Sequence, residues 1–477
     1  MNRKTAGILC SAGGIAALAV ILAARETRSS TPPPRPPMED PPPVASTCGS
    51  APALATSDFG AGTMTAALSS QRVLVRSDGE IFASIELTAR DAAAAQRPPM
   101  NVAIVVDHSG SMQGEKIQRA RQAAAGLVER LGPEDRAAVV QFDDSAELLV
   151  PMIAADDAGR RRLIAGIQSI QDAGGTNISG GLELGRNEIM KNLEGNRVNR
   201  LILLSDGNAN IGVTDVPSLA RIASDASERG VRITTVGLGL DYNEDLMEQV
   251  AQNGRGQYYY VKDAPGLDAV FAGELRALQA TVAKTAELRL APACAGVEIA
   301  EVFGYPRRRE GQAVIVPLAD LAGGDKRKIV VRIKVPTATT GTAKVLDAAL
   351  EFDPAGGGAR RHVPALLGVV VDEDAAQVRA SSVPIVQAQV AQVETAQAER
   401  QAAEAYQRGD QSRALRILSD GKAKLEAKRG YLDAKAFDSV NGELGGVAHG
   451  IASTPAASPM APAVTKAAKK SAYDAAR

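Results

Sequence analysis

The spacing of hydrophobic positions changes along the chain, and its middle part alternates between two patterns. From about 100 to 278, short unbroken apolar runs alternate with segments whose apolar residues recur every three or four positions. The runs at 102–106 and 201–204 are typical of strands buried on both faces, and the segments between such runs predict helices. This alternation predicts an α/β domain, doubly wound around a mostly parallel sheet.

The regions on either side of this domain have the spacing of strands. Residues 81–87 alternate between apolar and polar side chains, a shorter alternation covers 73–75, and Ser77-Asp78-Gly79 would form the turn of a hairpin between them. A two-stranded hairpin is not stable alone, so we expect both strands to pair with strands after 285. In 285–380, turns rich in Pro and Gly separate six further strand candidates, which predict a sandwich-like all-β module. The six candidates are 286–290, 297–302, 313–316, 328–335, 346–352 and 365–371.

The C-terminal region has helical spacing. Residues 384–450 are expected to be helical, and the apolar positions on either side of Gly409-Asp410 resemble one tetratricopeptide-style helical hairpin. One such hairpin is weak evidence for a solenoid, which needs about three repeats. The last segment, 451–477, is rich in Ala, Pro and Lys, and we expect it to be disordered.

The N-terminal residues have the pattern of an export signal. Arg3 and Lys4 precede an apolar run that ends before Arg25, so 1–24 is either a cleaved signal peptide or a retained membrane anchor. In both cases the positive end stays inside, and the rest of the chain is exported to the periplasm or cell surface, with membrane contact only through this segment. The Pro-rich residues 25–60 predict an extended linker, and 61–99 are assigned to the N-terminal strands of the β-module.

Composition narrows the classes of function. Lys and Arg number 54 and Asp and Glu 55, so no basic excess supports nucleic-acid binding. Three Cys and three His are scattered along the chain, which argues against a zinc site or a Cys/His metal cluster. Outside the cytoplasm Cys48 and Cys294 could form a disulfide, but two free thiols are the simpler interpretation because Cys48 lies in the linker.

Candidate ligands for a metal follow the expected strands of the α/β domain. Asp107, Ser109 and Ser111 come directly after the first buried strand, Thr176 precedes a helix, and Asp206 follows another buried strand. Ligands of doubly wound sheets bind outside the carboxyl ends of the strands, so the fold could bring the five together. Two carboxylates and three hydroxyls form an all-oxygen set, which hard cations such as Mg²⁺ prefer.

These five residues resemble the metal-ion-dependent adhesion site of von Willebrand factor type A domains, in order and in context. The resemblance covers about 100 to 278, and 318–325 resembles the β-region of exported bacterial proteins with this domain. It implies a Rossmann-like domain in which the two Ser and the Thr contact Mg²⁺, Mn²⁺ or Ca²⁺, and the two Asp act directly or through water. It further implies that a protein partner supplies an Asp or Glu to complete the coordination shell. We also expect the loop at Asp107 to be surface-exposed.

Three functions compete at this stage. The favoured one is an exported protein-binding module for adhesion or assembly, with no enzymatic activity. The first alternative is a scaffold that acts through its β and helical regions, with a non-essential metal site. The second is a metal-dependent hydrolase, which is less favoured because Ser109 stands where haloacid-dehalogenase-type phosphatases carry a second Asp, and no phosphate-loop or nucleophile-elbow motif occurs.

Overall fold

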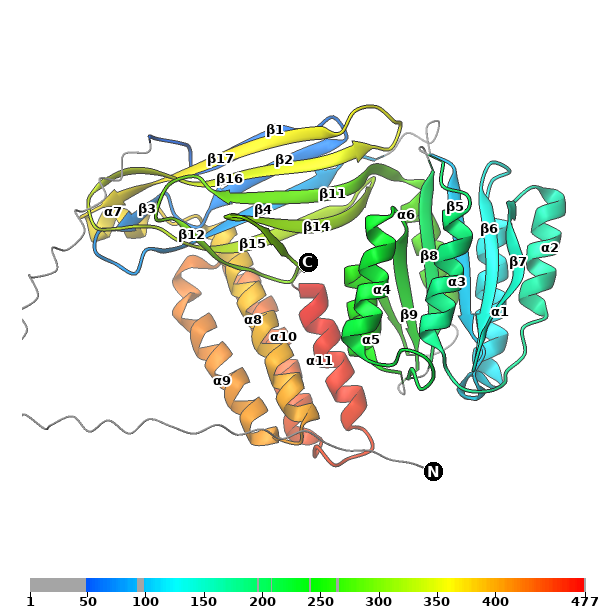
Figure 1. Ribbon diagram of the computed structural model, residues 1–477. Helices are drawn as coiled ribbons and strands as arrows, with labels where there is room; N and C mark the ends of the chain where they lie inside the picture. Colours follow the sequence, from blue (N-terminus) through cyan, green and yellow to red (C-terminus); the bar gives the residue numbers. More distant parts are fainter. Residues whose placement is uncertain are drawn as a thin grey trace, which may run out of the picture. The chain divides into compact units, whose positions relative to one another are not determined.

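The computed structural model describes residues 49–91, 98–194, 197–206, 208–239, 242–262 and 266–475 (Figure 1). The expected signal peptide or anchor at 1–24, most of the expected linker, and Cys48 lie outside the described residues. In the described part of the chain, no helix is both long enough and apolar enough to cross a membrane.

The α/β domain is built on a six-stranded sheet, in which five neighbouring strands are parallel and β7 runs antiparallel to β6. The strand order is β10-β9-β8-β5-β6-β7. Every residue of the central strand β5 is buried, as the unbroken apolar run at 102–106 predicts. The strands are β5 (Met100–Asp107), β6 (Arg136–Phe142), β7 (Ala146–Ala154), β8 (Val198–Ser205), β9 (Arg232–Leu238) and β10 (Arg255–Val261).

Helices cover both faces of this sheet (Figure 1). Because side chains of a strand alternate between faces, Ile104 packs into the core on one side and Val105 into the core on the other. The first core is closed by α1 (Glu115–Glu129), α2 (Asp157–Gln168) and α6 (Leu267–Gln279), and the second by α3 (Ile178–Met190), α4 (Val216–Glu228) and α5 (Glu244–Asn253). The predicted doubly wound α/β class is confirmed.

Two elements of this domain, β7 and α2, were not predicted. In both, the sequence shows the spacing of apolar residues only weakly. Strand β7 lies at the sheet edge and is only partly buried, and Pro151 interrupts it, as edge strands tolerate. Helix α2 contains two glycines and three consecutive arginines, which hide its apolar face. That face nevertheless exists, because Leu163 and Ile167 are fully buried.

Two sheets, antiparallel except for the pairing of β3 with β17, enclose a second core and form the β-sandwich. Their strand orders are β1-β2-β4-β15-β12 and β13-β14-β11-β16-β17-β3. All six strands expected after 285 are present, and most are longer than predicted. The strands are β1 (Leu54–Asp58), β2 (Gly62–Leu68), β3 (Arg72–Leu74), β4 (Glu80–Ala89), β11 (Thr281–Pro292), β12 (Glu298–Val302), β13 (Arg308–Glu310), β14 (Ala313–Ala322), β15 (Lys326–Lys334), β16 (Gly341–Pro354) and β17 (Arg361–Asp372).

The α/β domain is inserted between strands of this sandwich. Strand β4 precedes the domain and pairs antiparallel with β15, which follows it, so that Ile85 lies opposite Ile329. Strand β3 pairs in parallel with β17 at Val73 and Val371. The expected pairing of these N-terminal strands with strands after 285 is therefore confirmed.

Three expectations for the flanking regions were wrong. The proposed hairpin of β3 and β4 does not form, because the two strands lie in different sheets and the backbone of Arg76 bonds to Thr337. Strand β1 occupies part of the range expected to be linker. Cys294 is disulfide-bonded, so the interpretation of two free thiols fails for Cys294.

The C-terminal region is helical, and the expected turn at Gly409-Asp410 joins its first two long helices into a hairpin. Helix α8 also packs along the five-stranded sheet through Val390 and Val393, against Phe82 and Val330. The helices are α7 (Ala375–Ala380), α8 (Pro384–Gln407), α9 (Gln411–Ala427), α10 (Ala434–Ser453) and α11 (Ala461–Ala475).

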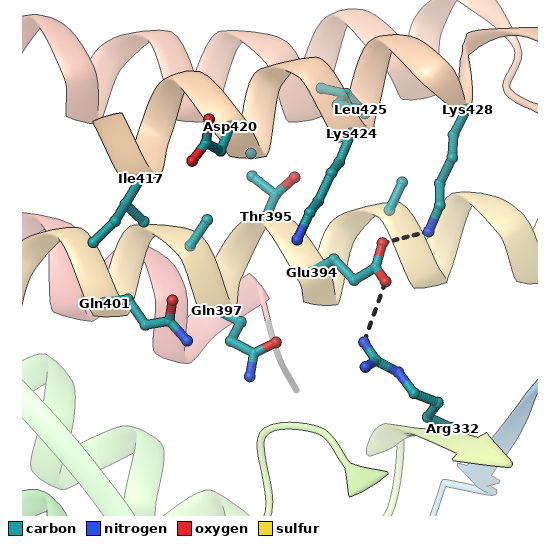
Figure 2. A pocket seen from close by; sticks show the side chains of 13 residues that line it. Arg332, Glu394, Thr395, Gln397, Gln401, Ile417, Asp420, Lys424, Leu425 and Lys428 are labelled. Atoms are coloured by element: carbon teal, nitrogen blue, oxygen red, sulfur yellow. Dashed lines mark hydrogen bonds and ion pairs between the residues drawn. The ribbon is translucent and has the colours of Figure 1, made fainter. Parts of the chain in front are cut away.

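Charged side chains hold α8, α9 and β15 together at a pocket between the two helices (Figure 2). Glu394 of α8 lies between two cations: Lys428, which caps the end of α9, pairs with one carboxylate oxygen, and Arg332 of β15 donates to the other across 3.4 Å. The hairpin is thus fastened to the sandwich as well as to itself.

The prediction of a disordered tail was wrong, because 461–475 form helix α11. Its alanines are a packing face: Ala472 and Ala475 lie against Ala396 of α8. Its lysines are paired: Lys469 is 4% exposed and donates to both carboxylate oxygens of Asp245, at 2.8 and 2.9 Å. Composition suggested disorder because it does not reveal that these alanines and lysines share one buried face.

Glu399 of α8 is a buried acid in this helical region, with an exposed fraction of 1%. Burial raises the pKa of its carboxyl to about 7, the Ser471 hydroxyl of α11 opposes this shift, and the charge of Glu443 in α10 adds to it. The folded state therefore favours the protonated acid.

We expect the replacement of Glu399 to change how the free energy of unfolding depends on pH. Between about pH 4.5 and 7 the carboxyl of the unfolded chain is ionised while the folded chain keeps its proton, so the free energy of unfolding falls as pH rises through this window. Glu399→Gln lacks this loss and should gain about 2–3 kcal/mol over the wild type between about pH 5 and 8. Urea denaturation followed by circular dichroism at both pH values measures the difference.

The matched control is Glu426→Gln on α9, whose carboxylate is 45% exposed. It should follow the wild type at both pH values. Equal pH dependence in Glu399→Gln and the wild type would contradict the prediction.

Candidate metal centre at the carboxyl edge of the α/β sheet

Two acidic side chains are placed together by the ends of neighbouring parallel strands. Asp107 is the last residue of β5, Ser205 is the last residue of β8, and Asp206 follows it. The two strands are in register up to Val106 opposite Leu204, so they end at the same edge of the sheet. Asp107 and Asp206 are both 0% exposed.

A continuous hydrogen-bond network connects four of the five predicted ligands. The Asp107 carboxylate accepts from the Ser205 hydroxyl at 2.5 Å and from the Ser109 backbone N–H at 2.8 Å. The hydroxyls of Ser109 and Ser111 are 3.0 Å apart, and Ser111 donates to Asp206 Oδ1 at 2.7 Å. Side chains up to 99 positions apart therefore meet in one cluster of oxygens, because the sheet aligns their strands.

The loop that carries Thr176 is joined to the same edge through its backbone. Gly110 N–H donates to the Gly174 carbonyl at 3.2 Å, and Thr176 N–H donates to Asn210 Oδ1 at 2.8 Å. Thr176 is 3% exposed, and the next residue, Asn177, caps α3 by accepting from Gly180 N–H. The helix cap and the candidate ligand are therefore different residues of one loop.

The expectation of a surface-exposed loop at Asp107 is right for Gly110 and Ser111 and wrong for Asp107 and Ser109. Ser109 is 2% exposed, and the two Asp and Thr176 are equally well buried, whereas Ser111 is exposed. The loops fold back over the strand ends: Ala173 N–H donates to the His108 carbonyl at 2.7 Å. Substitutions at Asp107 consequently affect stability as well as binding, because they remove the acceptor of a buried hydroxyl.

Burial also shapes the charge of the site. It raises the pKa of Asp107 to about 6, hydrogen bonds from Ser205 and Ser109 oppose that shift, and the charge of Asp206 adds to it. A cation lies close by, because Lys116 at the start of α1 pairs with Asp206 Oδ2 and donates to the Ser111 carbonyl at 3.2 Å. The two acids therefore lie in a place that favours positive charge.

The donor chemistry fits a hard divalent cation. The described residues contain no group of three or more His, Cys, Asp and Glu that could hold a metal, so a cation at this edge would depend on hydroxyl oxygens together with two carboxylates. Mg²⁺ accepts such a set, keeping water at the remaining positions. The hydrogen-bond network supplies these oxygens, with the buried Asp107 and Asp206 as its charged members.

Sequence reasoning missed the residues that support the ligands. Ser205 could have been suspected, since it ends a buried strand beside Asp206. Lys116 had no such signal in the sequence, because its contact with Asp206 depends on the direction in which α1 runs from the loop after Asp107. His108 also had no such signal; it is buried, with Nδ1 2.6 Å from the Gln171 carbonyl and Nε2 3.9 Å from an Asp143 carboxylate oxygen. It thus connects two loops of the site.

The class of this domain is confirmed by comparison with known proteins. Residues 101–272 match the family of the von Willebrand factor type A domain, and they therefore form such a domain. The chain is 29% identical over 227 residues to the uncharacterized protein YfbK of Escherichia coli (strain K12), a match that covers 47% of this chain and 39% of that protein. The matched segment is thus well under half of that relative.

Solved structures extend the likeness beyond the inserted domain. The von Willebrand factor type A protein from Catenulispora acidiphila aligns with a TM-score of 0.64 at 18% identity, covering 77% of this chain and 89% of that one. The ArnB paralog VWA2 from Sulfolobus acidocaldarius aligns with a TM-score of 0.58 at 15% identity, covering 88% of this chain and 100% of that one. Both likenesses concern the fold.

The bond between Ser205 and Asp107 leads to a prediction about stability. Ser205→Ala leaves a buried carboxylate oxygen without its hydroxyl donor, which should lower the free energy of unfolding by about 1–3 kcal/mol. Urea denaturation in the presence of a chelator measures this loss. Ser169→Ala is the control, because that exposed hydroxyl donates to the Gly166 carbonyl at the end of α2 and should cost under about 0.5 kcal/mol. Equal losses in the two variants would show that the buried bond has no special weight.

Proposed function

We propose that this protein is an exported, divalent-cation-dependent protein-binding module for adhesion or assembly, and that it is not an enzyme. The observation that carries the proposal is the network of carboxylates and hydroxyls at the carboxyl edge of the sheet, buried except at Ser111. In this proposal the cation is Mg²⁺, Mn²⁺ or Ca²⁺, and its ligands are Asp107, Ser109, Ser111, Thr176 and Asp206.

The charge of the donor set supports a partner carboxylate as the missing ligand. Three of the five proposed ligands are neutral hydroxyls, so the two acids supply all the negative charge. A cation held in this way keeps exchangeable water at one or more positions. An Asp or Glu of a protein partner can replace that water and gain a charge-assisted contact.

Hydrolysis is the less favoured function. A hydrolase of this kind needs a general base near the reacting group. His108 is the His of this edge, and its ring contacts the Gln171 carbonyl and faces the Asp143 carboxylate. The Ser109 and Ser111 hydroxyls bond to each other, and Ser111 bonds onward to an acid. The arrangement suits holding a cation better than activating a nucleophile.

The proposed location follows from the N-terminal charge and hydropathy pattern at 1–24. Export to the periplasm or cell surface would place the binding edge outside the cytoplasm, with membrane contact only through that segment. A nucleic-acid partner is not proposed, since the net charge of the chain is −1.

The proposal predicts capture of a partner that depends on both the metal and the acids. A pull-down from the native source should recover a partner in Mg²⁺ and lose at least 90% of it in chelator, because the partner's carboxylate then has no cation to bind. Asp107→Ala should lose the partner even in Mg²⁺. Thr176→Ala is a second variant that keeps both buried carboxylates, and circular dichroism verifies that each variant is folded.

Asp225→Ala is the matched control, since this acid lies exposed on α4 away from the network. It should capture the partner like the wild type. Capture that persists in chelator and in Asp107→Ala would instead favour the scaffold alternative, in which the β and helical regions bind the partner and the metal site is not essential.

A further inference from the structure

Lys116 is a cation placed directly on one of the proposed ligands. It is the second residue of α1, and its ammonium group contacts two groups of the site: Asp206 Oδ2 and the backbone carbonyl of Ser111. The other oxygen of Asp206 accepts from the Ser111 hydroxyl at 2.7 Å. Both oxygens of this fully buried carboxylate therefore have partners before any metal is considered.

We propose that Lys116 is a built-in counter-ion that competes with the divalent cation for Asp206 and thereby sets the affinity of the metal site. The inference rests on the proposed function, because it concerns the same site. A divalent cation and an ammonium group cannot share Asp206 Oδ2, since their charges repel strongly at contact distance in a partly desolvated place. Metal binding at that oxygen therefore requires the ammonium group to leave.

The Lys116 side chain can move into solvent when it leaves Asp206. It is 30% exposed, unlike the acid that it contacts. Gly239, just past the end of β9, lies beside the end of this side chain: a Cβ built on this glycine would be 3.8 Å from both Cε and Nζ of Lys116. The side chain thus lies at the rim of the site and can turn towards solvent without opening the core.

Removing Lys116 should change the metal affinity in opposite directions, depending on whether this lysine competes with the metal or only holds Asp206 in place. If Lys116 merely held Asp206 in place, its removal would disorder a ligand and weaken metal binding. If it competes, its removal leaves two buried acids with less compensation, so the metal-free protein is less stable and the cation binds more tightly. The sign of the change in affinity therefore separates the two roles.

The test is Mn²⁺ binding by the full chain, measured by isothermal titration calorimetry, together with melting temperatures with and without Mn²⁺. Lys116→Met should bind Mn²⁺ about tenfold more tightly than the wild type, which corresponds to the loss of one charge-assisted competitor. It should also show a larger rise in melting temperature on adding Mn²⁺. Lys116→Arg keeps the positive charge and should stay within about threefold of the wild type.

Arg119→Met is the matched control on the same helix, since Arg119 pairs with Glu115 and Gln122 and not with the site. It removes one positive charge from α1 and should leave Mn²⁺ affinity within about twofold. Unchanged or weaker binding in Lys116→Met, with normal binding in the wild type, would overturn the role of Lys116 alone. Absence of Mn²⁺ binding in every variant would overturn the proposed metal site together with it.

Discussion

Two carboxylates buried in one network, Asp107 and Asp206, constrain the whole edge of the α/β domain. Burying an acid without partners costs several kcal/mol, and two acids in one network also repel each other. This cost is offset by hydroxyl and backbone donors from Ser109, Ser111 and Ser205, and by the ammonium group of Lys116. An edge built in this way is rich in oxygen, poor in compensating charge, and receptive to a small hard cation.

The predictable part of the fold is the part whose pattern is local and strong. Strand β5 appears as an unbroken apolar run because both of its faces are buried, and the residues that follow such strands must meet at one edge. That is why Asp107, Ser109, Ser111 and Asp206 could be placed together in advance, whereas Thr176, which precedes a helix, was named from the resemblance to a known site. Their burial could not, because it depends on how the loop at Ala173 folds back over the strand ends.

Other features depend on partners that are distant in sequence. Nothing near β3 reveals that it pairs with β17 rather than with β4. The lysines of α11 resemble those of a solvated tail until Glu244 and Asp245 of α5 are placed beside them. Lys116 is the same case at the metal edge: an ordinary lysine in the sequence, but a counter-ion once α1 is oriented. In each case the missing information is a long-range contact, which composition and periodicity do not contain.

The insertion of the α/β domain between β4 and β15 also has a consequence for synthesis on the ribosome. Roughly 240 residues separate the end of β4 from the start of its partner strand, so at about 5–20 residues per second β4 waits some 10–50 seconds for β15 to emerge. During that time β1, β2 and β4 can form a meander, but the free side of β4 remains an open edge able to pair with other chains. The α/β domain is complete before β15 emerges, and its folding would bring the two strands near each other. The inserted domain thus helps to close the sheet that it interrupts in sequence.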